Sequence, residues 1–214
     1  MALLDKKKIL SLFFLNKRTS RIPESFRFTN TIFVHIPKCA GQSVGFGLYG
    51  HTVHHSKIAS MFEVDPVFCR NAYKFAVVRD PVERFLSAYN YLKMGGRLES
   101  DKKLYERWLS GRTIDDFLLY LKEIAVDDMP ELFHFHTQSS FVFSHNKSRL
   151  MVDRIYRVDQ LDQLLRDFNL CSSLPAIVDN FPVYNQSNKL VSKLNQESED
   201  IVRSLYQVDY KNFF

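Results

Sequence analysis

The chain has 214 residues, of which 45% are hydrophobic and 25% charged, and its formal net charge is +5 at pH 7. These values are typical of a folded globular protein of one domain, and they exclude disordered and low-complexity chains. A basic protein suits polyanionic ligands, but the sequence lacks the basic and aromatic stripe that is typical of nucleic-acid binding. Its three cysteines are too widely spaced for a disulfide framework or a zinc motif, which suits a reducing compartment.

Residues 1–30 form a basic and apolar extension. Three lysines at positions 6–8 precede an apolar run at residues 9–15. That run is far shorter than the roughly 20 residues that span a bilayer, and no small-residue cleavage site follows it. We expect residues 1–20 to form a helix packed on the domain, or, as the alternative, to touch a membrane surface. Either case predicts a cytoplasmic protein, peripheral at the inner membrane in the second.

Residues 31–36 form an apolar run rich in β-branched side chains, which predicts a buried parallel strand. The run stops at Pro37, and a polar loop that carries Lys38 leads into a predicted helix. Four of the seven glycines in the chain follow within ten residues, at positions 41–50. A strand, a tight loop with a lysine and a helix N-terminus predict a phosphate- or sulfate-binding loop. The order of residues excludes a Walker A loop, and an ordinary βα turn is the alternative.

A dense cluster of histidines follows in residues 50–62: His51, His54 and His55. Zinc is disfavoured because no cysteine or carboxylate has a suitable spacing. Histidine titrates near neutral pH and can take a proton from a hydroxyl, so the cluster is a candidate for a general base. Glu63 and Asp65 are further candidates. The alternative is a turn whose histidines only cap and pack.

Residues 75–78 predict a second buried strand, and apolar residues at helical spacing follow it. Asp80 suits the N-cap of that helix. Arg79 therefore lies at the carboxyl end of a strand, where open α/β sheets bind ligands. Its guanidinium and the Ser87 hydroxyl could bind a second phosphate. The alternative for Arg79 is an ion pair with Asp80 or Glu83.

The C-terminal half continues the alternation. Residues 93–150 predict a helical insertion followed by a polar segment, with Thr113 as a helix cap. Residues 154–158 predict a third strand, with Asp159 as the cap of the next helix, and residues 195–207 a terminal helix. Strands alternating with helices predict an α/β fold, a three-layer, P-loop-like domain with a central, mainly parallel sheet flanked by helices.

Two stretches together resemble a known family. HIPKCAGQS, at residues 35–43, resembles the 5′-phosphosulfate loop of sulfotransferases that use 3′-phosphoadenosine 5′-phosphosulfate (PAPS), commonly H-I-P-K-T-A-G-T-S in the carbohydrate branch. FAVVRDPVERFLSAYNY, at residues 75–91, is similar to the 3′-phosphate element of that branch, a strand followed by R-[DN]-P-x-x-R-x-x-S-x-Y. The resemblance covers residues 31–214. The chain departs from the common loop at Cys39 and Gln42, both usually threonine, where backbone donors survive the change.

The resemblance implies a function and a set of site residues. The enzyme would transfer a sulfuryl group from PAPS to a hydroxyl of a carbohydrate or glycolipid acceptor, without a metal. Lys38 would be catalytic at the bridging oxygen, and His55, with His54 as the alternative, would be the base. The 5′-phosphate and sulfuryl group would contact Lys38, Cys39, Ala40, Gly41, Gln42 and Ser43. The 3′-phosphate would contact Arg79 and Ser87, and Lys189 would contact the 3′-phosphate or the acceptor. The acceptor would contact His51, His136 and Gln138.

Several alternatives stay open at this stage. The base could also be His51 or Glu63. A P-loop-like kinase of a small molecule would need magnesium for activity, and a non-catalytic glycan- or nucleotide-binding module would bind the donor without turnover. The family's Golgi members carry a membrane anchor that this sequence lacks, so we expect a bacterial enzyme.

Overall fold

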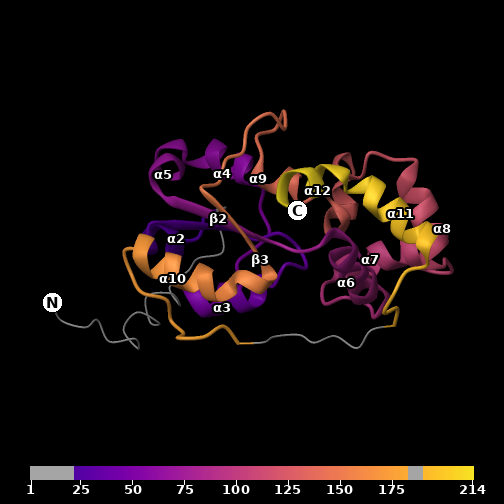
Figure 1. The fold of residues 1–214 in the computed structure, drawn as a ribbon, viewed down its shortest axis with the longest axis horizontal. Coiled ribbons are helices and arrows are strands. Elements are labelled where there is room, and N and C mark those ends of the chain that lie inside the picture. Colours follow the sequence, from indigo (N-terminus) through magenta and orange to yellow (C-terminus); the bar gives the residue numbers. More distant parts are fainter. Residues whose placement is uncertain (1–21, 183–189) are drawn as a thin grey trace. The chain divides into compact units, whose positions relative to one another are not determined.

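The computed structural model describes residues 22–182 and 190–214, which divide into two compact units (Figure 1). The first, called the sheet unit here, contains the described residues of Met1–Val78 and Phe141–Tyr184. The second, called the helical unit, contains those of Arg79–Ser140 and Asn185–Phe214. The expected helix at residues 1–20 and the predicted contact of Lys189 lie outside the described residues, and the boundary predicted after residue 30 stays a prediction.

The sheet unit is built on three parallel strands in the order β1-β2-β3. The strands are β1 (Thr31–Val34), β2 (Tyr73–Val78) and β3 (Arg154–Arg157). Its helices are α2 (Glu24–Thr29), α3 (Gly41–Tyr49), α4 (Ile58–Val64), α5 (Pro66–Asn71) and α10 (Leu161–Cys171), with a 3-10 turn at Val158–Gln160. A short helix, α9 (Ser139–Val142), crosses the boundary between the units. The predictions of an α/β fold and of three parallel strands are confirmed.

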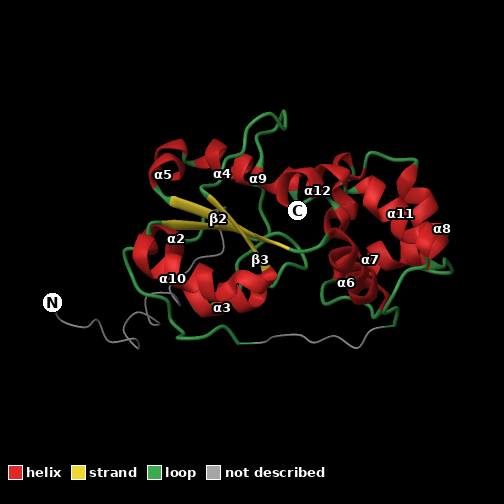
Figure 2. Cartoon of the chain, in the orientation of Figure 1, coloured by secondary structure: helices red, strands yellow, loops and turns green. Residues whose placement is uncertain are grey.

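Buried side chains on β1 and β2 form the centre of this unit. All four residues of β1 are buried, as a parallel strand covered on both faces requires. In the view of Figure 2, α4 and α5 lie on one side of the strands and α2, α3 and α10 on the other. Phe75 on β2 stacks on Phe33 of β1, with 5.4 Å between ring centroids, and meets Phe168 of α10 edge-on. The register pairs Val34 with Ala76, so β1 and β2 end at the same edge of the sheet.

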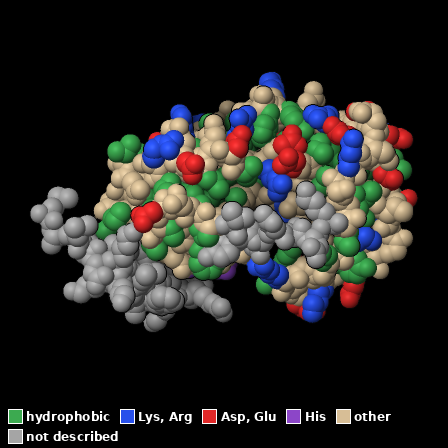
Figure 3. Space-filling model, turned by 60° about the horizontal axis from the view of Figure 1, so that its bottom comes forward, with side chains coloured by type: hydrophobic (Ala, Val, Ile, Leu, Met, Phe, Trp, Pro, Cys, Tyr) green, Lys and Arg blue, Asp and Glu red, His purple; other side chains and the backbone are tan. Residues whose placement is uncertain are grey.

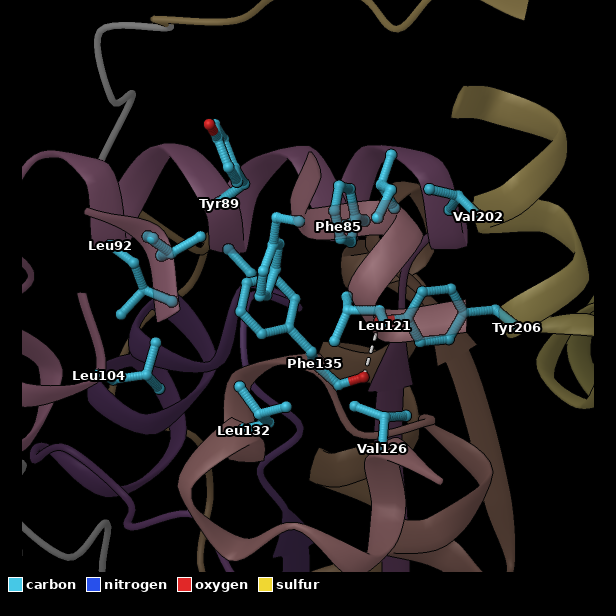
Figure 4. Close-up of a cluster of buried hydrophobic side chains, with 14 of the residues drawn as sticks. Phe85, Tyr89, Leu92, Leu104, Leu121, Val126, Leu132, Phe135, Val202 and Tyr206 are labelled. Carbon is cyan, nitrogen blue, oxygen red and sulfur yellow. Dashed lines mark hydrogen bonds between the residues drawn. The ribbon is translucent and has the colours of Figure 1, made fainter. Parts of the chain in front are cut away.

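The helical unit surrounds a separate apolar core. Its helices are α6 (Pro81–Lys93), α7 (Glu99–Leu104), α8 (Ile114–Lys122), α11 (Gln196–Leu205) and α12 (Gln207–Phe213), with a π-helical turn at Tyr105–Leu109 and 3-10 turns at Val126–Asp128 and Pro130–Phe135. Figure 4 shows Phe85 of α6, Phe135 and Tyr206 converging in this core. Tyr206 is fully buried, and its hydroxyl donates a hydrogen bond to the Phe135 carbonyl at 2.7 Å.

Helix caps test the local predictions. The Asp80 carboxylate accepts hydrogen bonds from the amides of Val82 and Glu83, which confirms it as the N-cap of α6. Thr113 caps α8 in the same way. The prediction for Asp159 is wrong, because a 3-10 turn precedes α10 and Gln160 is its N-cap residue. The Asp159 carboxylate instead pairs with Arg157 at 3.3 Å.

Charges of both signs are interspersed over the described part of the face in Figure 3. Within residues 22–182 and 190–214, none of the helices has both the length and the apolar character needed to cross a membrane. The expected cytoplasmic location stays a prediction.

Candidate functional site

The loop after β1 holds an unusual backbone conformation. Two residues other than glycine, Lys38 and Ala40, have positive φ angles of 67° and 56°. Such angles cost free energy for L-amino acids and gather at functional loops, where backbone amides form a concave site for an anion. Ala40 is the N-cap residue of α3, and no side chain caps the helix there. The positive end of the α3 dipole is therefore directed into this loop.

His35, for which the sequence analysis named no role, packs against Gly41 at the end of the loop. Its Nδ1 lies 2.5 Å from the Val53 carbonyl, and its imidazole is buried. A Cβ atom at Gly41 would overlap the His35 ring, so the first residue of α3 must be glycine for the two to pack. Burial and the neighbouring His55 lower the pKa of His35 to about 3, so it is neutral at physiological pH.

The remaining loop residues are buried or half-buried. The Cys39 side chain is buried, and its Sγ lies 3.6 Å from the Pro37 carbonyl, so the thiol fills a small interior space. Ser43 is also buried, in the first turn of α3. Lys38 and Gln42 are half-buried. Their predicted contacts with a donor stay predictions.

Of the three clustered histidines, His55 lies against the loop. Its ring is 3.9 Å from the ring of His35, centroid to centroid. Its Nδ1 lies 2.9 Å from the His35 carbonyl, which can only accept, so Nδ1 carries the proton of the neutral ring. The lone pair of neutral His55 is then on Nε2, the state that a general base requires. His54 is exposed.

The other candidates from this segment have structural contacts. Nε2 of His51 lies 2.9 Å from the Ser25 hydroxyl, and its Nδ1 lies 3.1 Å from the Thr52 carbonyl. Glu63 pairs with His145 at 2.8 Å on the surface. Asp65 caps α5 and pairs with Arg27. These contacts favour structural roles for all three candidates.

Arg79 follows β2 directly, and its backbone is held by a side chain. The Arg79 amide donates to Gln138 Oε1 at 2.9 Å, and Gln138 Nε2 donates to the Arg79 carbonyl at 2.9 Å. The guanidinium donates from Nε to Glu83 at 3.0 Å, which is the ion pair that the sequence left open. Ser87 is half-buried on α6, one turn after Glu83, so these two side chains lie on the same side of that helix.

Arg84, five residues after Arg79, is the second residue for which the sequence analysis named no role. It is fully buried and donates to the carbonyls of His134 and His136, at 3.2 and 2.6 Å. The His136 ring is also buried, with Nε2 3.0 Å from the Met129 carbonyl. The structure therefore gives His136 and Gln138 internal contacts, and their predicted contact with an acceptor stays a prediction.

The described residues contain no group of three or more histidine, cysteine, aspartate or glutamate side chains that could hold a metal ion. Within the sheet unit, the structure brings together Lys38, His35, Gly41 and His55. Within the helical unit, it brings together Arg79, Glu83 and Gln138.

These observations define an α/β protein in which a loop with positive φ angles joins a buried strand to the uncapped start of a helix, beside His55. A sequence model described as "Sulfotransferase family" matches residues 27–214. The chain therefore belongs to the sulfotransferase family, and membership indicates a transferase of sulfuryl groups. A comparison with curated proteins finds no match.

Proposed function

We propose that this protein transfers the sulfuryl group of PAPS to a hydroxyl of a carbohydrate or glycolipid acceptor. The observation that carries the proposal is the loop at residues 37–43, in a chain that matches the sulfotransferase family over residues 27–214. Its positive-φ backbone, its lysine and the uncapped start of α3 suit an anionic phosphosulfate. A three-layer, P-loop-like nucleotide-binding arrangement belongs to the same proposal.

The residues divide the chemistry as follows. The S–O bond between the sulfuryl group and the 5′-phosphate breaks, and a new S–O bond forms to the acceptor oxygen. The acceptor proton passes to Nε2 of His55, and 3′-phosphoadenosine 5′-phosphate (PAP) leaves. Lys38 stabilises the charge that develops on the departing phosphate oxygen. As in phosphoryl transfer, positioning and electrostatic stabilisation supply most of the rate enhancement.

Arg79 and Ser87 are proposed to bind the 3′-phosphate of the donor. Glu83 accepts a hydrogen bond only from Nε of Arg79. Within the described residues, no partner is found for the two terminal nitrogens of the Arg79 guanidinium. A guanidinium presenting those nitrogens can bind a phosphate with two parallel hydrogen bonds.

Calorimetric titration with PAP in EDTA tests the donor assignment. Wild type should bind with micromolar affinity, about −8 kcal/mol, and Arg79→Ala should bind far more weakly. The Arg203→Ala variant is a matched control, because Arg203 lies on α11 and pairs with Glu199. If wild type does not bind PAP but binds ATP once magnesium is added, the sulfotransferase reaction is wrong and a kinase replaces it.

A further inference from the structure

Arg79 follows the last paired residue of β2, and a side chain makes hydrogen bonds to its backbone. The last paired residue of β2 is Val78, opposite Arg157. At the next residue, the carboxamide of Gln138 makes two hydrogen bonds of 2.9 Å, one to the Arg79 amide and one to its carbonyl. Gln138 is fully buried, so water does not compete for these bonds. The carboxamide therefore takes the place of a strand partner.

Gln138 is itself held from the C-terminus. Its amide donates to Oδ2 of Asp209 at 2.8 Å. The other oxygen of Asp209 accepts from the amide and the hydroxyl of Ser139, at 2.8 and 2.7 Å. Asp209 lies on α12, 70 residues after Ser139, and is fully buried. A single buried carboxylate thus fixes the backbone from which the Gln138 side chain extends.

A buried carboxylate is costly, and the surrounding contacts show how this one is stabilised. Burial raises the pKa of Asp209, and the field of Arg84 together with the Gln138 and Ser139 donors opposes that rise. Arg84 also binds two carbonyls of the segment that precedes Gln138. Tyr206 binds a third, as the dashed line in Figure 4 marks. Residues 134–139 are therefore held by α6 and by the C-terminal helices together.

We propose that Gln138 and Asp209 are positioning residues that set Arg79 for recognition of the 3′-phosphate of the donor. The inference rests on the proposed function and deepens it, because it assigns a part in nucleotide selectivity to two residues that act on Arg79 through hydrogen bonds within the protein. The reason is geometric. Gln138 fixes the Arg79 backbone and Glu83 fixes Nε, so the direction of the terminal nitrogens is set before the nucleotide binds.

The test compares two nucleotides that differ only at the 3′ position. PAP and AMP are titrated calorimetrically in EDTA against the full chain. Wild type should prefer PAP by about 10- to 100-fold, the range of hydrogen bonds to a charged group. Gln138→Met, similar in size but unable to hold Arg79, should reduce that preference to about 3-fold or less. The affinity for AMP should stay within about 2-fold of wild type.

Two further variants separate positioning from folding. Gln138→Glu keeps an acceptor for the Arg79 amide but loses the donor, so its preference should be intermediate. Asp209→Asn keeps one acceptor for Ser139 and should also lose part of the preference. Gln196→Met, which changes an exposed glutamine on α11, should behave as wild type. Thermal melts without nucleotide confirm that each variant is folded.

The outcomes are distinguishable. If wild type does not prefer PAP over AMP, the donor assignment fails and the inference falls with it. If wild type prefers PAP and Arg79→Ala loses the preference while Gln138→Met keeps it, the donor site stands and the positioning role is refuted. If Gln138→Met weakens PAP and AMP equally, Gln138 supports the fold as a whole and the inference is also refuted.

Discussion

The contact between Gly41 and His35 makes a sharp prediction for Gly41→Ala. Gly41 is the first residue of α3, and the three atoms nearest to the position that a Cβ would take there all belong to the His35 imidazole. That ring cannot easily move away. Its Nδ1 is bound to the Val53 carbonyl at 2.5 Å, Phe33 stacks on one side, and His55 lies 3.9 Å away. Alanine should therefore displace the ring and break its buried hydrogen bond.

The magnitude follows from three effects. Overpacking a well-packed interior costs about 1–3 kcal/mol. Losing the partner of a buried polar group costs about 1–3 kcal/mol. Against these, alanine in place of glycine in a helix gains about 0.5–1 kcal/mol. We expect Gly41→Ala to lower the free energy of unfolding by about 2–4 kcal/mol, the balance of these terms.

A double-mutant cycle with His35→Ala isolates the contact. Urea unfolding is measured for wild type, Gly41→Ala, His35→Ala and the double variant. Once the imidazole is gone, alanine at position 41 should cost less than about 0.5 kcal/mol, which gives an interaction energy of about 1.5–4 kcal/mol. If Gly41→Ala costs the same in both backgrounds, the overlap with His35 is not the reason for glycine. PAP titration of Gly41→Ala should also show weakened binding, because the displaced ring packs against Gly41 in the loop that we propose binds the donor.

Three other predictions follow from the same contacts. The pKa of His35 is lowered from 6.5 to about 3 in the folded protein, so between these pH values the unfolded chain binds one more proton than the folded chain. The contribution of neutral His35 to the free energy of unfolding should therefore be fully present above about pH 6.5 and be lost as the pH falls toward 3. In urea titrations across this range, His35→Gln should show a smaller pH dependence than wild type, and parallel curves would contradict the assignment. In a sulfuryl-transfer assay, Lys38→Ala should lower kcat by about 10²-fold or more, and His55→Ala by about 10²- to 10⁴-fold; an unchanged kcat removes that residue from the mechanism. Arg84→Met should lower the free energy of unfolding by about 3–5 kcal/mol, because it leaves the buried Asp209 without its counter-charge; a loss under about 1 kcal/mol would show that Asp209 is neutral in the folded protein.

Local sequence signals predicted the elements well. Apolar, β-branched runs predicted β1 and β2, since a parallel strand buried on both faces needs such side chains along its whole length. The third predicted strand, β3, lies at the edge of the sheet, and only Tyr156 of its four residues is buried. The caps at Asp80 and Thr113 were predictable because a cap bonds to amides two or three residues away. The cap predicted at Asp159 was wrong because a 3-10 turn lies between β3 and α10, and such a turn leaves no clear local signal in the sequence.

The kind of site was also predicted from the sequence alone. A strand, a lysine loop and a helix start lie within residues 31–43, and their order along the chain is enough to predict an anion-binding loop. The histidine cluster was equally visible. The sequence did not show which of these histidines lies against the loop, because that depends on a hydrogen bond between His55 and His35, which are 20 residues apart.

Only the tertiary structure decided which residues support the site. His35 reads as one more residue of an apolar run, and Gln138 and Asp209 as a polar loop residue and a helix residue. The roles of Gln138 and Asp209 come from hydrogen bonds between distant segments. Arg79 and Gln138 are 59 residues apart, and Gln138 and Asp209 are 71 residues apart. Periodicity and capping report contacts within a turn or two of chain. A buried amide or carboxylate that must find its partner across the fold has no such local signature, because its partner is selected by burial and packing.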